Sequence, residues 1–110
     1  MRKMERQPTH PGKIIKEDYL IPLSITVNDM ALMLGVSRKT LSKIVNARGA
    51  ITPDMALRLS RALDTTPIFW LNLQKNFELW QAEHTSTEWQ RVQPFSAQLL
   101  HPQQVHGATS

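Results

Sequence analysis

The chain has 110 residues, of which 41% are hydrophobic, so it is long enough for one compact domain with a buried core. It contains no cysteine, which excludes disulfides and cysteine-ligated metals, and its apolar runs are far shorter than the roughly 20 residues that span a bilayer. The formal charge is +4 and the N-terminus lacks the apolar stretch of a secretory signal, so we expect a cytoplasmic protein that does not contact a membrane.

The first predicted helix begins near His10 and Pro11. Ile15 and Tyr19 lie four residues apart and therefore share one face of this helix. We expect it to end at Pro22, because proline cannot donate the backbone hydrogen bond that would continue the helix.

The second predicted helix begins after Thr26 and the third after Ser37. Thr26 and Asp29 resemble a capping box, in which a threonine is followed by an acid three residues later. Gly35 is expected to end the second helix in the left-handed conformation. The apolar residues that should face inward are Val27, Ala31 and Leu34 in the second helix, and Leu41, Ile44 and Val45 in the third.

The fourth and fifth predicted helices share a start signal. Thr52 is followed by Pro53 and Asp54, and Thr66 is followed by Pro67, which places a capping hydroxyl before a proline that suits the first helical position. The residues expected on the core side of the fourth helix are Ala56, Leu59, Ala62 and Leu63.

A broad aromatic stripe runs along the fifth predicted helix. Its members are Phe69, Trp70, Leu73, Phe77 and Trp80. The stripe is wider than a small helical core requires, and two interpretations stay open. Either it closes the core alone, or part of it also forms a dimer interface, for which Phe77 and Trp80 are the candidates.

The stretch "ALMLGVSRKTLSKIVN", residues 31 to 46, breaks an apolar helix for three residues and restarts it with two cations. A helix of about eight residues, a short turn opened by glycine and a second helix form the helix-turn-helix pattern. No acid occurs between Met30 and Pro53, and this positive stretch suits a polyanion. The alternative is a helical hairpin whose basic face is merely solvated.

The helix-turn-helix interpretation assigns a role to each outward residue. The second helix would enter the major groove of DNA with its N-terminal residues against base edges. The candidate base-reading residues are Arg38, Lys39, Thr40 and Lys43. The candidate phosphate-binding residues are Asn28, Ser37, Ser42, Asn46 and Arg48.

Residues 8–80 resemble the HigA branch of the Cro/repressor-like (XRE) helix-turn-helix family. The motifs that carry this resemblance are "HPG" at 10–12, "LGVSRKTLSKIVN", "ITPDMALRLSRAL" and "TTPIFWLNLQ". The resemblance implies an antitoxin of a type II toxin–antitoxin module that forms a homodimer and binds a palindromic operator of its own operon. It also implies neutralisation of a HigB/RelE-like mRNA interferase, although a stand-alone transcriptional repressor of the same fold is the alternative.

The expected fold is all-α, a compact five-helix Cro/repressor-like domain. We place an N-terminal arm at residues 1–9, the DNA-binding domain at 10–84 and a weakly structured C-terminal extension at 85–110. This extension carries few charges and a small apolar cluster, whose middle could form a docked segment. The cluster consists of Val92, Phe95, Leu99 and Leu100.

An enzyme is the third function class, and the sequence disfavours it. The histidines show no metal-ligand spacing on a common helix face, and each is interpreted as a surface residue. No glycine-rich phosphate loop occurs, and no nucleophile has a neighbouring base. We therefore expect no catalytic residue, no metal and no cofactor. The histidines in question are His10, His84, His101 and His106.

Overall fold

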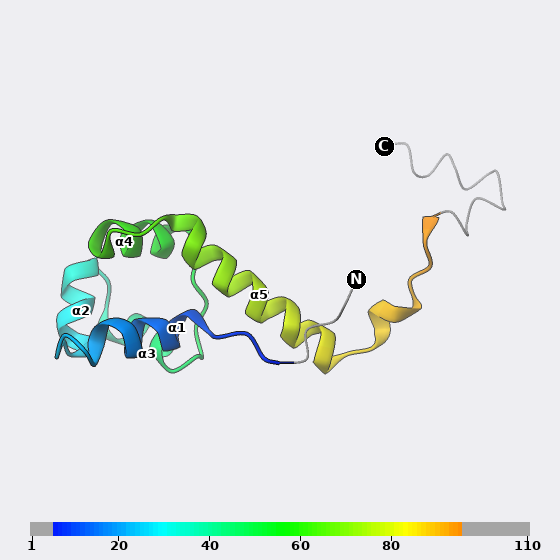
Figure 1. Cartoon of the computed structure of the whole chain (residues 1–110), viewed down its shortest axis with the longest axis horizontal. Coiled ribbons are helices and arrows are strands. Elements are labelled where there is room, and N and C mark those ends of the chain that lie inside the picture. The colour runs from blue at the N-terminus through cyan, green and yellow to red at the C-terminus, as the bar shows by residue number, and fades with distance from the viewer. Residues whose placement is uncertain (1–5, 96–110) are drawn as a thin grey trace.

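The computed structural model describes residues 6–95 and contains helices and no strands in that range (Figure 1). Four helices, α1 to α4, gather into one cluster, and the longer α5 extends away from it. This confirms the expected all-α, five-helix fold. The helical segments are α1 (Pro11–Ile14), η1 (Ile15–Leu20), α2 (Val27–Leu34), α3 (Arg38–Val45), α4 (Pro53–Leu63), α5 (Pro67–Thr85) and η2 (Glu88–Arg91).

The first predicted helix is one continuous structure with a change of winding. It starts as an α-helix and passes into a π-helical segment, η1, in which hydrogen bonds span five residues. The Ile21 amide, for example, donates to the Lys16 carbonyl at 3.0 Å. The helix ends before Pro22, as predicted, but apolar periodicity gave no sign of the wider turn.

Four helices begin at a side-chain cap that the sequence predicted. The hydroxyl oxygen of Thr26, Ser37, Thr52 or Thr66 accepts a hydrogen bond from the backbone amide three residues later, at 3.0–3.2 Å. Each cap satisfies one of the four backbone amides that a helix start leaves without a partner inside the helix. The helix boundaries are therefore encoded locally.

The core lies between α1, α2, α3 and α4 and is closed by the first half of α5. Trp70 is fully buried there, and its indole nitrogen donates to the Thr65 hydroxyl at 2.6 Å. Ala62 was expected in this core and is exposed instead, so that prediction was wrong. Leu59 and Leu63 complete the inner face of α4 without it. The core cluster is formed by Ile15, Leu20, Met30, Ala31, Leu34, Leu41, Ile44, Ile51, Met55, Ala56, Leu59 and Trp70.

The "HPG" stretch packs directly beneath the end of α3. A Cβ atom at Gly12 would lie 1.8 Å from the Ile44 carbonyl oxygen, so only glycine fits. His10 is buried, and its Nδ1 accepts a hydrogen bond from the Gly12 amide at 2.9 Å. Its ring meets Phe77 of α5 edge to face at 4.8 Å. His10 is therefore a structural residue at the junction of three elements, and the prediction of a surface histidine was wrong.

Phe77 is the last buried residue that α5 contributes, and the rest of α5 with the described segment after it extends away from the core (Figure 1). Gln74 attaches α5 to the body of the domain, because its Oε1 accepts a hydrogen bond from the Ile51 amide at 2.9 Å. Val92 and Phe95 of the predicted apolar cluster are 75% and 48% exposed, so the described part of that cluster is not docked on the domain. Leu99 and Leu100 lie outside the described residues.

Candidate nucleic-acid interface

The turn between α2 and α3 has the geometry that the sequence predicted. Gly35 has φ +71°, in the left-handed region that glycine adopts without steric cost. The Val36 amide then donates to the Ala31 carbonyl at 3.0 Å, which closes the end of α2. Ala31 is 2% exposed, as expected at a close helix crossing. The two helices are thus held at a fixed angle by a three-residue turn.

One side of α3 is fixed in the core and the other side is open. Leu41 and Ile44 are 0% and 3% exposed, and they hold the helix against its neighbours. The four predicted base-reading residues lie together on the exposed face and its N-terminal end, and within residues 6–95 their cations form no ion pair. These residues, the α3 reading face, are Arg38, Lys39, Thr40 and Lys43.

The charges at the start of α3 oppose the helix dipole. The N-terminal end of a helix carries a partial positive charge, which favours acids there and disfavours cations by about 0.3–1 kcal/mol each. The first turn of α3 contains no acid and begins with Arg38 and Lys39. A polyanion at this end would neutralise both the cations and the dipole.

Ser37 and Thr40 are coupled by two hydrogen bonds. The Ser37 hydroxyl oxygen accepts from the Thr40 amide at 3.0 Å, and the hydroxyl donates to the Thr40 Oγ1 at 2.9 Å. The Thr40 hydroxyl keeps its own hydrogen, so it is the member of the pair able to donate to a phosphate or a base. Ser37 acts through its cap, which fixes the start of α3.

Ser42 and Asn46 also pair with each other. The Asn46 Nδ2 donates to the Ser42 carbonyl at 2.9 Å and to the Ser42 hydroxyl oxygen at 3.3 Å. The Asn46 Nδ2 is therefore engaged with Ser42 in this rotamer, and the Asn46 Oδ1 can only accept hydrogen bonds. Phosphate oxygens only accept hydrogen bonds, so Asn46 must change rotamer to contact the DNA backbone, whereas the Ser42 hydroxyl still has a hydrogen to donate.

The remaining two predicted phosphate contacts flank α3 in the chain. Asn28 is exposed at the second residue of α2, and Arg48 is exposed in the loop after α3. The Arg48 amide donates to the Lys43 carbonyl at 2.7 Å, which folds this loop back onto the last turn of α3. The Arg48 guanidinium forms no ion pair within residues 6–95.

The predicted dimer residues of α5 differ in their surroundings. Phe77 packs against His10 of the same chain and is only 9% exposed, so little of its surface is left for a partner. Trp80 is half-buried and stacks on His84 at 4.2 Å, and its buried indole nitrogen has no hydrogen-bond partner within the described chain. Leu79, which the sequence analysis did not single out, is 57% exposed.

His10 is the clearest functional-site residue that sequence reasoning misplaced. Burial lowers the pKa of His10 below its ordinary value, and a hydrogen bond to the backbone of Gly49 opposes that shift. Gly49 follows Arg48 in the loop after α3, so the imidazole ties the N-terminal segment to this side of the interface. The proline and glycine that follow His10 were the available signal, since a short polar side chain before them can cap a helix.

Other site classes find no support in the described residues. Between residues 6 and 95 no three histidine, aspartate or glutamate side chains lie close enough together to hold a metal ion. No helix in that range is long and apolar enough to cross a bilayer. His101 and His106 lie outside the described residues.

Comparison with known proteins agrees with this geometry. Residues 15–71 match the family model described as "Helix-turn-helix". The chain is 49% identical over 81 residues to an uncharacterised HTH-type transcriptional regulator of Haemophilus influenzae, covering 74% of this chain and 76% of that protein. It is 39% identical over 88 residues to antitoxin HigA-1 of Vibrio cholerae, covering 80% of this chain and 83% of that protein.

A solved structure extends the similarity to three dimensions. The antitoxin GraA in complex with its operator superimposes with a TM-score of 0.77 at 41% sequence identity, covering 86% of this chain and 97% of that chain. Residues 15–71, which the family model matches, contain the turn between α2 and α3 and the α3 reading face. The chain therefore belongs to the helix-turn-helix family, in the branch of the HigA-type antitoxins, and is a DNA-binding protein rather than an enzyme.

Proposed function

We propose that this protein is the antitoxin of a type II toxin–antitoxin module, a homodimer that represses its own operon by binding a palindromic operator. In this role it also neutralises a HigB/RelE-like mRNA interferase. The α3 reading face is the observation that carries the DNA-binding part, because its cations are exposed and form no ion pair with another residue of the described range. Base contacts come from Arg38, Lys39, Thr40 and Lys43. Phosphate contacts come from Asn28, Ser42 and Arg48, and from Asn46 after a change of rotamer, while Ser37 contributes through the cap that fixes the start of α3.

The similarity to named antitoxins supports the toxin-neutralising part. One relative is named antitoxin HigA-1, and a similar structure is that of an antitoxin bound to its operator. A stand-alone repressor is the second candidate, because another similar relative is named only as a transcriptional regulator. The same helix-turn-helix serves either role, so the two candidates differ in their protein partner and not in their DNA contacts.

A gel-shift titration with the DNA upstream of the gene for this protein distinguishes the antitoxin from the stand-alone repressor. The protein is titrated with and without the product of the neighbouring gene, and a random duplex of equal length is the control. Specific binding that the neighbour's product modulates is the expected result for an autoregulating antitoxin. Specific binding without any response would assign the stand-alone repressor, and equal affinity for both duplexes would refute operator recognition.

We infer that the dimer forms through the second half of α5. Leu79 presents an exposed apolar side chain there, and the buried Trp80 nitrogen has no hydrogen-bond acceptor among residues 6–95. An unsatisfied buried donor costs about 1–3 kcal/mol, which an acceptor from a second copy would recover. Phe77 contributes by holding this part of α5 against His10, rather than by facing the partner.

Sedimentation of two variants tests this interface. Leu79→Lys and Trp80→Ala should each shift the mass toward the monomer while the helical circular-dichroism signal persists. Leu57→Lys is the matched control, because Leu57 of α4 has the same 57% exposure as Leu79 and lies on another face. If both α5 variants remained dimeric, the second half of α5 would not be the dimer interface. Trp80 would then have a role only within its own chain.

A further inference from the structure

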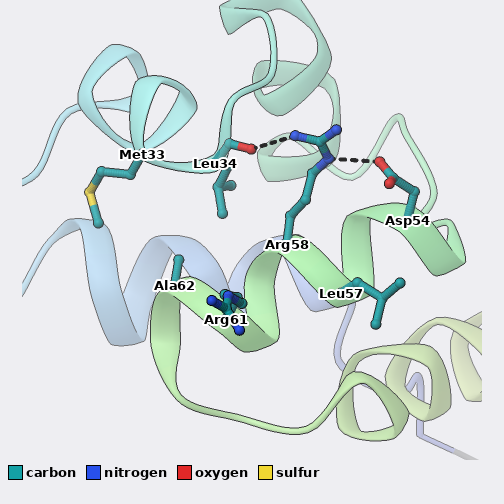
Figure 2. Close-up of a pocket in the computed structure, with 7 residues that line it drawn as sticks. All are labelled: Met33, Leu34, Asp54, Leu57, Arg58, Arg61 and Ala62. Atoms are coloured by element: carbon teal, nitrogen blue, oxygen red, sulfur yellow. Dashed lines mark hydrogen bonds and ion pairs between the residues drawn. The ribbon is translucent and has the colours of Figure 1, made fainter.

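A hollow of about 410 Å³ opens where the end of α2 meets α4, and two arginines of α4, Arg58 and Arg61, line it (Figure 2). Arg58 of α4 reaches from the hollow to the turn of the helix-turn-helix. Its Nη1 donates to the Leu34 carbonyl at 2.8 Å and to the Gly35 carbonyl at 3.2 Å. From the same guanidinium, Nε donates to the Asp54 carboxylate at 2.7 Å.

The two carbonyls that Arg58 binds are among those that the helix end leaves without a partner inside the helix. The last four carbonyls of a helix accept no hydrogen bond from within it. At the end of α2 the Gly35 amide donates to the Leu32 carbonyl, and the Val36 amide donates to the Ala31 carbonyl. The Leu34 and Gly35 carbonyls are then satisfied by the cation of Arg58, which also suits the negative end of the helix dipole.

Gly35 and Arg58 are sterically matched as well. A Cβ atom at Gly35 would lie 3.0 Å from the Arg58 Nη1, tighter than side chains normally approach. The glycine thus serves two purposes, since its φ of +71° also requires it. The contact between α4 and the turn therefore depends on both residues, because Gly35 leaves the space that the Arg58 guanidinium occupies.

The ion pair between Arg58 and Asp54 orients rather than stabilises. The two side chains are 40% and 72% exposed, and ion pairs at such exposed positions add little to the free energy of unfolding. The contact nevertheless favours the rotamer in which Arg58 Nε faces Asp54 and Nη1 faces the turn. Asp54 lies one turn before Arg58 on α4, which places both groups on the same helix face.

We propose that Arg58, oriented by Asp54, is a positioning residue for DNA recognition. It holds the peptide groups of Leu34 and Gly35 and thereby fixes the path of the chain into Ser37 and the first turn of α3. Base readout needs side chains held within about half an ångström, so a looser turn costs specific contacts before it costs non-specific ones. This inference rests on the proposed operator recognition.

Binding of two duplexes tests the proposal, one from the chain's own upstream region and one of random sequence. For Arg58→Met, the preference for the upstream duplex should fall roughly tenfold, the equivalent of one charge-assisted hydrogen bond, while random-duplex affinity and its salt dependence stay unchanged. Arg58→Lys should restore part of the preference. Adding Asp54→Asn to Arg58→Met should cause no further loss. Arg61→Met, an exposed arginine on the same helix without an ion pair in the described chain, is the control and should match wild type.

Two results would overturn the proposal. Equal loss on both duplexes with a salt slope lower by about one would make Arg58 a phosphate contact. If Arg58→Met kept the wild-type preference for the upstream duplex, Arg58 would have no role in DNA recognition.

Hydrogen exchange of the DNA-free protein gives a second readout that does not depend on the operator. In Arg58→Met the amides of Gly35 and Val36 should exchange about tenfold faster, while those of Trp70 and its neighbours in α5 keep their rates. Acceleration shared by α5 would indicate general destabilisation and contradict a positioning role. Wild-type protein without a preference for the upstream duplex would overturn the proposed function, and the exchange rates would still decide whether Arg58 holds the turn.

Discussion

Helices α3 and α4 are built alike but carry charges of opposite sign in their first turns. Both begin with a hydroxyl cap, from Ser37 and Thr52, and both bury one apolar face in the same core. Helix α4 then continues with Pro53 and Asp54, which suit the first turn, whereas α3 continues with two cations. The difference shows that α4 is optimised for its own stability, while α3 gives up a part of its stability to present positive charge.

Helix α3, whose first turn is destabilised by its cations, depends on neighbouring elements for its position. Helix α3 has eight residues, too few to be stable in isolation, and its fixed orientation comes from α1, the turn and the core. Gly12 packs against its last turn and the Ser37 cap fixes its first turn. Rigid support for a charged, exposed helix is what recognition of a DNA groove requires.

The largest effect is expected from removing the support beneath α3. Gly12→Ala places a Cβ atom where only 1.8 Å separates it from the Ile44 carbonyl oxygen, so the two elements must move apart. Overpacking of this kind costs about 1–3 kcal/mol, or roughly 4–8 °C in Tm for each kcal/mol in a domain of this size. Calorimetry of the variant measures this shift.

Gly49→Ala is the matched control for that substitution. A Cβ atom at Gly49 would lie 3.2 Å from the Lys43 Cβ, a contact that a small shift relieves. Its Tm should therefore fall by much less than that of Gly12→Ala. A wild-type Tm for Gly12→Ala would show that α1 does not support α3 in the way described.

A charge reversal in α3 should change stability and binding in opposite directions. Lys39→Glu gives the first turn of α3 the acid that α4 has, so the free energy of unfolding should rise by about 0.3–1 kcal/mol. Operator affinity should fall at least roughly tenfold, since a cation that contacts a base or phosphate is lost. Urea titration and gel shift measure the two quantities on the same preparation.

Lys75→Glu changes the net charge equally at a mid-helix position of α5, where the dipole has no preference. It should leave the free energy of unfolding nearly constant and weaken DNA binding far less. If Lys39→Glu destabilised the protein, or bound the operator as wild type does, the contrast between α3 and α4 would be wrong.

The smallest effect concerns the buried histidine at the base of α3. Burial lowers the pKa of His10, so the unfolded chain binds a proton more readily than the folded one. The stability that this neutral imidazole provides is present above its ordinary pKa of 6.5 and is lost as the pH falls through and below that value. His10→Asn keeps an acceptor for the Gly12 amide but does not titrate, so its Tm should decline less between pH 7.5 and pH 5.5. If the Tm of wild type and of His10→Asn declined equally with falling pH, His10 would not be the source of the pH dependence.

Local signals in the sequence predicted most of the fold. The caps at Thr26, Ser37, Thr52 and Thr66 and the left-handed Gly35 depend on neighbouring residues only, and each occurs where expected. The exposed cations of α3 were predictable for the same reason, because helical periodicity assigns them to the face opposite Leu41 and Ile44.

Residues whose role depends on distant partners were missed or misplaced. His10 is buried because Phe77, far along the chain, covers it, and Gln74 is buried because it bonds to the backbone of Ile51. Ala62 has helical spacing suited to the core but lies beside the hollow between α2 and α4 instead. The π-helical turn of η1 also has no periodic signal of its own, since apolar spacing in so short a segment fits an α-helix equally well.

The most direct test of DNA recognition by α3 is methylation interference on the upstream duplex, with wild-type protein and Arg38→Ala. Guanine N7 lies in the major groove, and a methyl group there blocks an arginine that reads this atom. Wild-type binding should be blocked by methylation at specific guanines. Arg38→Ala should bind the unmethylated duplex about 1–3 kcal/mol more weakly and become indifferent to methylation of one guanine in each half-site. The same set of blocking guanines for both proteins would contradict base reading by Arg38, and with it the central role given to the start of α3.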